Sequence, residues 1–233
     1  TAEKQPIEMV KSNIIGSQNI IEASKDYNVD ITIGISTDKA CNPKSLYGYS
    51  KIIMEKMFLE ANNEKNIFSC TRFGNVAGSN GSVIPFWLNC LKKDKPLPLT
   101  DVRMTRLMLN YDEVSEIIEK VIEEAKKGVG GIVLSKIMKK VELYRLANSI
   151  SKHTKIVGLR PGEYLHEDLI TESELEFSEL KENYIYIRKE INKNFNTRLK
   201  EPISSKNSLD LTDQEISQMI ELINENSFLN EHY

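Results

Sequence analysis

The hydrophobic residues of the chain recur with two periodicities, one typical of helices and one typical of strands. Ile7, Val10, Ile14 and Ile21 recur at helical spacing and predict a helix over residues 6–25. A short β-branched run at 30–36 predicts a buried strand. The same patterns predict further elements: helices at 47–64, 83–91, 112–127 and 141–151, strands at 67–73, 131–134 and 155–159, and a short apolar run at 106–110.

The order of these elements indicates an α/β fold with a parallel sheet. Strands alternate with helices at a spacing that favours right-handed crossovers between parallel strands. In the second predicted helix, four residues are expected to face the core: Ile52, Ile53, Met57 and Leu59. The alternation breaks at the glycine-rich loop that starts at Gly74, so we expect a sheet-forming part to be followed there by a smaller mixed part.

The pattern weakens in the last quarter of the sequence. Beyond about residue 171 the chain is charged and irregular, and its acidic cluster is interpreted as a solvated face: Glu172, Glu174, Glu176 and Glu179. A clear signal returns at 212–215, where Thr-Asp-Gln-Glu forms a capping box in front of a terminal amphipathic helix.

Composition and charge exclude several classes of protein. The 233 residues carry 31 Lys and Arg against 34 Asp and Glu, a net charge of -3, so a broadly basic nucleic-acid-binding surface is excluded. No apolar run approaches the roughly 18 residues of a membrane span. No signal-peptide pattern opens the sequence, and Cys41, Cys70 and Cys90 are scattered, so we expect a cytoplasmic protein with reduced thiols.

The stretch between the first predicted strand and the second helix carries the candidate chemistry. The strand ends at Thr37, Asp38 and Lys39, and ligands bind at the carboxyl ends of strands in parallel sheets. The helix starts at Tyr47, and Lys51 shares its face four residues later. An ammonium beside a phenol favours the phenolate, which could act as a base. Tyr-x-x-x-Lys alone is a weak motif among 9 tyrosines, and the strand end strengthens it.

These motifs resemble those of the extended short-chain dehydrogenase/reductase superfamily. Residues 36–51 read STDKACNPKSLYGYSK, and with Lys39 after the acid this string is similar to that of the inverting UDP-N-acetylglucosamine 4,6-dehydratases. The resemblance extends from about residue 6 to about residue 170. Four further blocks carry it: KSNIIGSQN at 11–19, TRFGNVAGSNGS at 71–82, TDVRMTR at 100–106 and RPGEYLHE at 160–167.

The resemblance implies a role for each residue of the catalytic stretch. Tyr47 would take the proton of the sugar 4-hydroxyl, Thr37 would hydrogen-bond that hydroxyl, and Lys51 would hold the cofactor ribose and lower the pKa of the phenol. Lys39 would then remove the C5 proton, and Asp38 would protonate the departing 6-hydroxyl. The implied enzyme is a lyase of surface-polysaccharide biosynthesis: C4 is oxidised, water is lost across C5–C6, and hydride returns to C6 with inversion at C5.

The resemblance also implies a cofactor and a substrate. The cofactor would be NADP or NAD, bound by Asn13, Tyr47 and Lys51. The substrate would be a UDP-sugar bound by a second set of residues: Asn75, Gly78, Ser82, Arg106 and Arg160. No metal is expected, because His153, His166 and His232 show no ligand spacing, and His166 is interpreted as a structural hydrogen-bonding residue. The family commonly forms homo-oligomers, and a homo-oligomer stays open for this chain.

The family comparison suggests three regions. Residues 1–75 would be the remaining part of the cofactor-binding domain, 76–170 mainly the substrate-binding region interleaved with the sheet domain, and 171–233 a C-terminal extension with the terminal helix. The Gly-x-x-Gly-x-x-Gly turn that opens the family's cofactor domain has no counterpart in the sequence. We therefore expect a partial Rossmann-type sheet that lacks its first strands, and weak cofactor binding by this chain alone.

Two alternatives to the dehydratase remain. A UDP-hexose 4-epimerase belongs to the same superfamily, but such enzymes carry nothing comparable to Lys39 because they remove no C5 proton. A protein of another class would be a non-catalytic remnant that binds a nucleotide sugar or pairs with a full-length homologue. The presence of Lys39 favours the dehydratase over the epimerase.

Overall fold

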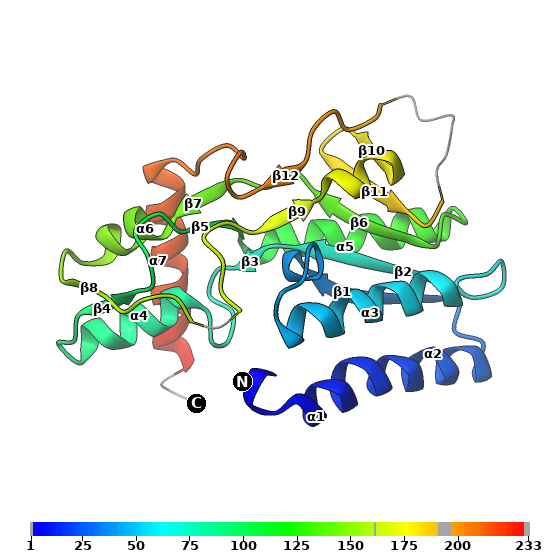
Figure 1. Ribbon diagram of the computed structural model, residues 1–233, viewed down its shortest axis with the longest axis horizontal. Helices are drawn as coiled ribbons and strands as arrows, with labels where there is room; N and C mark the ends of the chain where they lie inside the picture. Colours follow the sequence, from blue (N-terminus) through cyan, green and yellow to red (C-terminus); the bar gives the residue numbers. More distant parts are fainter. Residues whose placement is uncertain (1, 161, 191–196, 231–233) are drawn as a thin grey trace. The chain divides into compact units, whose positions relative to one another are not determined.

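The computed structural model describes residues 2–160, 162–190 and 197–230, and the chain divides into two compact units (Figure 1). Each unit is assembled from three separate stretches of sequence. Unit 1 comprises Thr1–Phe73, Ser115–Ile137 and Asp168–Ile203, and unit 2 comprises Gly74–Val114, Met138–Glu167 and Ser204–Tyr233.

Unit 1 is built around a five-stranded sheet in the order β1-β2-β6-β11-β10. Its strands are β1 (Ile31–Thr37), β2 (Ile67–Phe73), β6 (Ile132–Lys136), β10 (Ser178–Lys181) and β11 (Tyr184–Arg188). The first three strands run parallel, while β11 pairs antiparallel with both β6 and β10. The predicted α/β fold with a parallel sheet is therefore confirmed.

Helices cover both faces of this sheet. They are α1 (Pro6–Met9), the π-helical stretch η2 (Val10–Ile15), α2 (Gly16–Asp26), α3 (Leu46–Ala61) and most of α5 (Tyr111–Lys126). α3 packs on β1 and β2, and Val121 of α5 packs with Ile132 and Leu134 from the opposite face (Figure 1). The helix predicted over 6–25 is confirmed, with a π-helical stretch in its middle.

The face that α3 buries differs from the predicted one. Ile53 is 42% exposed, and Ile52 and Met57 are only partly buried. The buried face carries Met54, Glu55, Phe58 and Leu59. Of the predicted core positions, only Leu59 is buried, because an acidic residue, Glu55, turns inward to meet a charged partner in the sheet.

The expectation of irregular chain beyond residue 171 is also wrong. The short 3-10 helix η4 (Glu172–Phe177) leads into the hairpin of β10 and β11, which extends the main sheet. Ile185, Tyr186 and Ile187 are buried in β11. Charged residues on both sides of this five-residue strand hid its apolar pattern in the sequence.

Unit 2 contains two small sheets and three helices. Its strands are β3 (Asn75–Val76), β4 (Leu97–Leu99), β5 (Thr105–Leu109), β7 (Lys140–Glu142) and β8 (Thr154–Ile156), and its helices are α4 (Val83–Lys92), α6 (Leu143–Ile150) and α7 (Asp213–Asn230). One sheet has the order β3-β5-β7, and the other pairs β4 with β8. The short strands β9 (Asp168–Ile170) and β12 (Ile203–Ser204) lie where the chain passes between the units.

The core of unit 2 forms where α7 packs against α4 and α6. Trp87 of α4 is fully buried, and its Nε1 donates a hydrogen bond to the Pro98 carbonyl at 3.0 Å. At the start of α7, the Glu215 amide donates to Thr212 Oγ1 at 3.2 Å, and the Thr212 amide donates to Glu215 Oε2 at 2.8 Å. This reciprocal pair confirms the predicted capping box.

The capping box makes the stability of the protein depend on pH. The hydrogen bond from Lys139 Nζ, followed by that from the Thr212 amide, lowers the pKa of Glu215 to about 2. A lowered pKa in the folded state stabilises the fold above the ordinary carboxyl pKa, and this contribution is lost as the pH falls toward 2. Glu215→Gln should therefore lower the free energy of unfolding by about 0.5–1 kcal/mol at pH 7.

Thermal denaturation of Glu215→Gln and its parent across pH 2 to 7 tests this. The difference in Tm should shrink as the pH falls, and Glu221→Gln on the same helix serves as the matched control. A difference in Tm that stays constant down to pH 2 would show that the Glu215 charge does not stabilise the helix.

Candidate active site

The carboxyl end of β1 runs directly into a single 3-10 turn, η3 (Asp38–Ala40). Thr37 caps this turn, and its Oγ1 accepts a hydrogen bond from the Lys39 amide at 3.4 Å. The same hydroxyl donates to Asp38 Oδ1 at 3.0 Å, and Lys39 Nζ donates to that oxygen at 3.0 Å. Asp38 is fully buried, and its Oδ2 finds no hydrogen-bond partner in the described part of the chain. A buried carboxylate oxygen without a donor suits a site where a ligand hydroxyl binds.

The start of α3 lies against this turn because Gly48 has no side chain. A Cβ at Gly48 would lie 2.3 Å from the Lys39 carbonyl oxygen, closer than any real contact. Ser45 caps the helix, with its Oγ accepting from the Gly48 amide at 3.1 Å. The glycine thus allows the first turn of α3, which carries Tyr47, to approach the backbone of Lys39.

Tyr47 and Lys51 share one face of α3, but the ammonium does not act on the phenol. Lys51 Nζ donates to the Ile35 carbonyl at 2.7 Å, and burial lowers its pKa. Burial raises the pKa of Tyr47; Lys39 and a hydrogen bond with Thr37 oppose this rise, and Asp38 adds to it. The expected lowering of the Tyr47 pKa by Lys51 is therefore wrong in this structure, where the cation acting on the phenol is Lys39.

Asn13 reaches the same helix from the π-helical stretch η2. Its Nδ2 donates to Ser50 Oγ at 2.9 Å, and Ser50 Oγ donates in turn to the Tyr47 carbonyl at 2.7 Å. π-helical stretches shift side chains out of the α-helical register and are frequent at functional sites. The structure thus gathers all six predicted residues of unit 1 around the end of β1 and the first turns of α3: Asn13, Thr37, Asp38, Lys39, Tyr47 and Lys51.

Unit 2 holds a cavity of about 560 Å³, a volume typical of sites for small organic ligands. Four of the five residues predicted to bind substrate line it: Asn75, Ser82, Arg106 and Arg160. Gly78 does not line the cavity, but the neighbouring loop residues Ser79, Asn80 and Gly81 do. Apolar side chains, including Phe86 and Trp87, complete the wall.

Arg106 is held rigidly at the cavity wall. Its Nη1 donates to the Thr105 carbonyl at 2.7 Å and to the Leu165 carbonyl at 3.3 Å, and its Nε lies 3.6 Å from Glu167 Oε1. Ser82 Oγ is buried there without a hydrogen-bond partner among the described residues. Two arginines and an unpartnered hydroxyl are suited to binding an anion.

The described histidines form no metal site. His166 Nδ1 lies 2.7 Å from Thr105 Oγ1, in keeping with a structural hydrogen bond, and His232 lies outside the described residues. Across residues 2–160, 162–190 and 197–230, no group of three or more His, Cys, Asp or Glu residues could hold a metal ion. In the same ranges, no helix combines the length and apolarity that crossing a bilayer requires.

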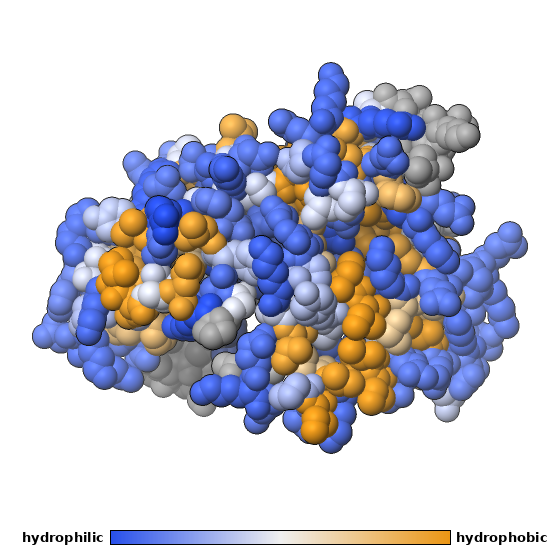
Figure 2. Space-filling model, in the orientation of Figure 1, coloured by the Kyte–Doolittle hydropathy of each residue, from blue (hydrophilic) through white to orange (hydrophobic). Residues whose placement is uncertain are grey.

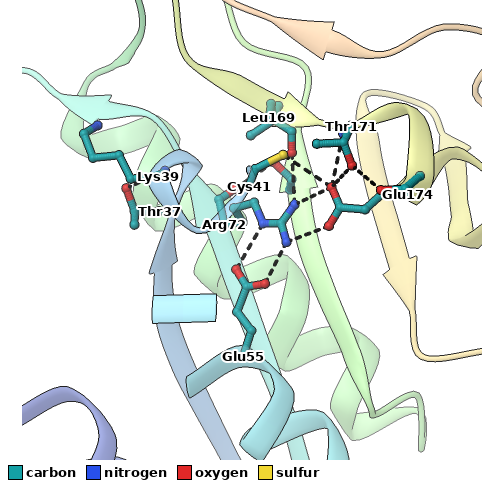
Figure 3. A network of polar contacts seen from close by, with 10 residues as sticks. Thr37, Lys39, Cys41, Glu55, Arg72, Leu169, Thr171 and Glu174 are labelled. Atoms are coloured by element: carbon teal, nitrogen blue, oxygen red, sulfur yellow. Dashed lines mark hydrogen bonds and ion pairs between the residues drawn. The ribbon is translucent and has the colours of Figure 1, made fainter. Parts of the chain in front are cut away.

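Sequence reasoning missed one polar cluster of unit 1, shown in Figure 3. Arg72 of β2 is fully buried between Glu55 of α3 and Glu174 of η4. The interpretation of the glutamates beyond residue 171 as a solvated face is therefore wrong for Glu174, whose side chain is 19% exposed, and for Glu179, which is buried. An arginine within a predicted buried strand was the signal that could have revealed this cluster.

The groups around Tyr47 predict how its pKa responds to substitution. Lys39→Ala removes the cation that opposes the effect of burial, so the pKa of Tyr47 should rise further, whereas Asp38→Asn should lower it. Titration of the chain labelled with 3-fluorotyrosine, followed by fluorine NMR and assigned with Tyr47→Phe, measures this. The exposed Lys56→Ala on α3 is the matched control, and a fall of the Tyr47 pKa in Lys39→Ala would contradict the described geometry.

Comparisons with known proteins agree with this fold. The model of the family described as polysaccharide biosynthesis protein matches residues 1–189. The UDP-N-acetylglucosamine 4,6-dehydratase (inverting) of Campylobacter jejuni is 38% identical over 193 residues, which cover 80% of this chain and 57% of that enzyme. The chain therefore spans less than two thirds of the length of this relative.

Two solved structures share the architecture. Pen from Bacillus thuringiensis is 26% identical with a TM-score of 0.86, over 96% of this chain and 71% of its own. The Thermus thermophilus UDP-glucose 4-epimerase, solved in complex with NAD, is 18% identical with a TM-score of 0.58, over 70% of this chain and 62% of its own. The chain belongs to the polysaccharide biosynthesis protein family and has the Rossmann-type fold of extended short-chain dehydrogenases/reductases.

Proposed function

We propose that this chain carries the catalytic centre of a nucleotide-sugar 4,6-dehydratase, a lyase that acts on UDP-N-acetylglucosamine and inverts C5. The observation that carries the proposal is the Asp38–Lys39 pair at the end of β1, beside Tyr47. The identity to the Campylobacter jejuni dehydratase supports it. The cytoplasmic location and the homo-oligomer stay predictions.

Loss of water across C5–C6 needs a base at C5 and an acid at the 6-hydroxyl. Lys39 is the base, and Asp38 is the acid. Lys39 Nζ lies 3.0 Å from Asp38 Oδ1, close enough for a proton to pass between them. Elimination would leave the amine with one proton more and the carboxyl with one proton fewer. Transfer of the proton back from Lys39 Nζ to Asp38 along this hydrogen bond restores the acid and the base. As hydride returns to C6, C5 would gain a proton from solvent on the opposite face, and Tyr47 would release to solvent the proton it took from the 4-hydroxyl.

The oxidation at C4 needs a base for the hydroxyl proton. Tyr47 is that base, and Thr37, which hydrogen-bonds the phenol, would bind the same sugar hydroxyl. Burial disfavours the phenolate, and Lys39 provides the opposing positive charge. The proton taken at the oxygen of C4 and the proton taken at C5 thus go to two neighbouring groups of unit 1.

The nicotinamide-ribose end of NADP or NAD fits the residues present. An ammonium has three N–H donors, and Lys51 uses two of them on the Ile35 carbonyl and Met54 Sδ, which leaves one for a ribose hydroxyl. Asn13 supports the Tyr47 backbone through Ser50, and its contact with the cofactor stays a prediction. The bound nicotinamide would accept hydride from C4 and return it to C6. The NAD in the Thermus thermophilus neighbour supports this class of cofactor.

The unit 2 cavity is proposed to bind the UDP moiety. Arg106 and Arg160 both line the cavity, and guanidinium groups bind phosphate well; Asn75 and the Ser79–Ser82 loop would supply further donors. Aromatic side chains in the wall provide apolar contact. Unit 2 would therefore hold the nucleotide portion of the substrate.

A UDP-hexose 4-epimerase is the second candidate, because an epimerase shares this fold and would use Tyr47 in the same way. The two functions differ at Lys39. An epimerase removes no C5 proton, so its turnover does not need this amine. The residue therefore separates the candidates by experiment.

We predict that Lys39→Ala lowers the formation of 4-keto-6-deoxy sugar from UDP-N-acetylglucosamine by about 10²–10⁴-fold, the usual contribution of a positioned acid or base. Oxidation at C4 should persist, so reduced cofactor should accumulate and be visible by its near-ultraviolet absorbance. Product NMR and absorbance measure the two steps, with Lys56→Ala as control. A C4 epimer formed equally by the parent and Lys39→Ala would replace the dehydratase with the epimerase.

We also predict that Arg160→Ala weakens UDP binding by about tenfold or more, because a charge-assisted hydrogen bond to phosphate is lost. Calorimetric titration with UDP measures the Kd, together with the absorbance of any bound cofactor. Arg103→Ala is the matched control, since Arg103 pairs with Asp101 and does not line the cavity. UDP binding without cofactor or turnover would favour the non-catalytic remnant, and equal Kd values for both variants would remove the diphosphate role of Arg160.

A further inference from the structure

A buried ion-pair network lies beside the catalytic residues of unit 1, and the proposed mechanism makes no use of it. Arg72 is 1% exposed, and its Nε and Nη2 donate to the two oxygens of Glu55 at 3.0 and 2.7 Å. Its Nη1 and Nη2 donate to the two oxygens of Glu174 at 3.0 and 2.9 Å. Nη1 also donates to the Leu169 carbonyl at 3.1 Å, and Figure 3 shows the guanidinium among these groups.

These five bonds use every donor that a guanidinium has. Burial alone would lower the pKa of Arg72, but Glu55 and Glu174 raise it well above its ordinary value. Burial alone would raise the pKa of Glu174, and Arg72 lowers it. The Cys41 thiol, whose pKa burial raises, donates to Glu174 Oε2 at 3.3 Å. The network is therefore charged, and its hydrogen-bond geometry admits one orientation of the arginine.

The partners of Arg72 belong to the segments that carry the catalytic residues. Glu55 follows Tyr47 by eight residues and Lys51 by four, so all three lie on one face of α3. Cys41 directly follows η3, which contains Asp38 and Lys39. Because Arg72 binds Glu55, it fixes the rotation of α3 about its axis. The hydrogen bond from Cys41 to Glu174 fixes the chain just after Asp38 and Lys39.

The strand that carries Arg72 is itself well anchored. Ser36 of β1 lies opposite Arg72 in the parallel ladder, one residue before Thr37. The Ser135 hydroxyl of β6 donates to the Arg72 carbonyl at 2.7 Å. The guanidinium therefore extends from a strand that is paired on both sides, and α3 and η4 are positioned against it.

We propose that Arg72 is a positioning residue for the catalytic groups: by clamping Glu55 and Glu174, it sets the rotation of α3 that places Tyr47 beside the Asp38–Lys39 turn. The effect of this positioning on turnover rests on the proposed dehydratase function. The positioning itself is a property of the folded chain and is measurable without substrate.

A network that only stabilised the fold would behave differently on substitution. Its loss would lower Tm but leave the surroundings of Tyr47 unchanged in the molecules that remain folded. Burial, Lys39, Asp38 and Thr37 set the pKa of Tyr47, so a change at Arg72 reaches the phenol through a change of position. The pKa of Tyr47 in the folded state therefore separates positioning from stability.

The test uses the full chain labelled with 3-fluorotyrosine and compares the parent with Arg72→Lys, Glu55→Gln and Glu174→Gln, each well below its Tm. Lysine keeps the charge but cannot form the fork, and glutamine keeps the shape of each partner. We expect the pKa of Tyr47 to fall by about 1 in Arg72→Lys and Glu55→Gln as the phenol gains solvent. Where turnover is measured, kcat should fall by about 100-fold with the Kd of UDP unchanged.

Val121→Ala is the matched control, because it removes buried volume from unit 1 on the α5 face of the sheet. It should lower Tm and leave the pKa of Tyr47 unchanged. An unchanged Tyr47 pKa in the folded variants would overturn the proposal. Should Arg72→Lys and Glu55→Gln fail to fold, Glu174→Gln decides by the same criterion, since Glu174 is the partly exposed arm of the clamp. A parent without turnover would count against the dehydratase function alone.

Discussion

The buried guanidinium of Arg72 constrains much of what surrounds it in unit 1. A buried charge that water cannot solvate needs charged or polar partners. Removing one partner from such a cluster typically lowers the free energy of unfolding by about 3–5 kcal/mol. That is a large share of the roughly 5–15 kcal/mol by which a native domain is stable. The sheet, α3 and the segment that starts at Leu169 therefore meet in one arrangement, with Glu55 turned inward and Ile53 left half exposed.

This constraint places ordinary side chains in an unusual chemical environment. Asp38 is buried with two donors on one oxygen and none on the other, and Lys39 is both its ion-pair partner and the cation that acts on Tyr47. A single lysine therefore couples the group proposed to oxidise C4 with the group proposed to eliminate water. Unit 2 contributes a cavity with two arginines, a different chemistry suited to binding an anion.

Features encoded by local pattern were predictable from the sequence, and features that depend on distant partners were not. Helix and strand periodicity located β1, β2, α3, α4 and α5 closely, and the capping box at Thr212 was read directly. The inward face of α3 was not predictable, because Glu55 is buried only through Arg72, and Arg72 in turn requires Glu174, 102 residues further along the chain.

In the candidate site, too, local motifs were predictable and contacts between distant residues were not. The motifs identified the residues that gather at the end of β1, and four of the five residues predicted to bind substrate line the cavity, while their roles remain proposals. The motif spacing suggested that Lys51 acts on Tyr47, because the two share a helix face. In the structure, the Lys51 ammonium donates to the Ile35 carbonyl, and Lys39 is the cation that acts on the phenol. This arrangement depends on how α3 packs on β1.

In the proposed mechanism, Lys39 removes a proton from C5 of the sugar while Asp38 protonates the departing 6-hydroxyl. The most direct measurement is product NMR after incubating the chain with UDP-N-acetylglucosamine and NADP or NAD in deuterium oxide. The expected product is a 4-keto-6-deoxy sugar with inverted C5 that carries deuterium from solvent at that carbon. A turned-over sugar that keeps its original proton at C5 would contradict it.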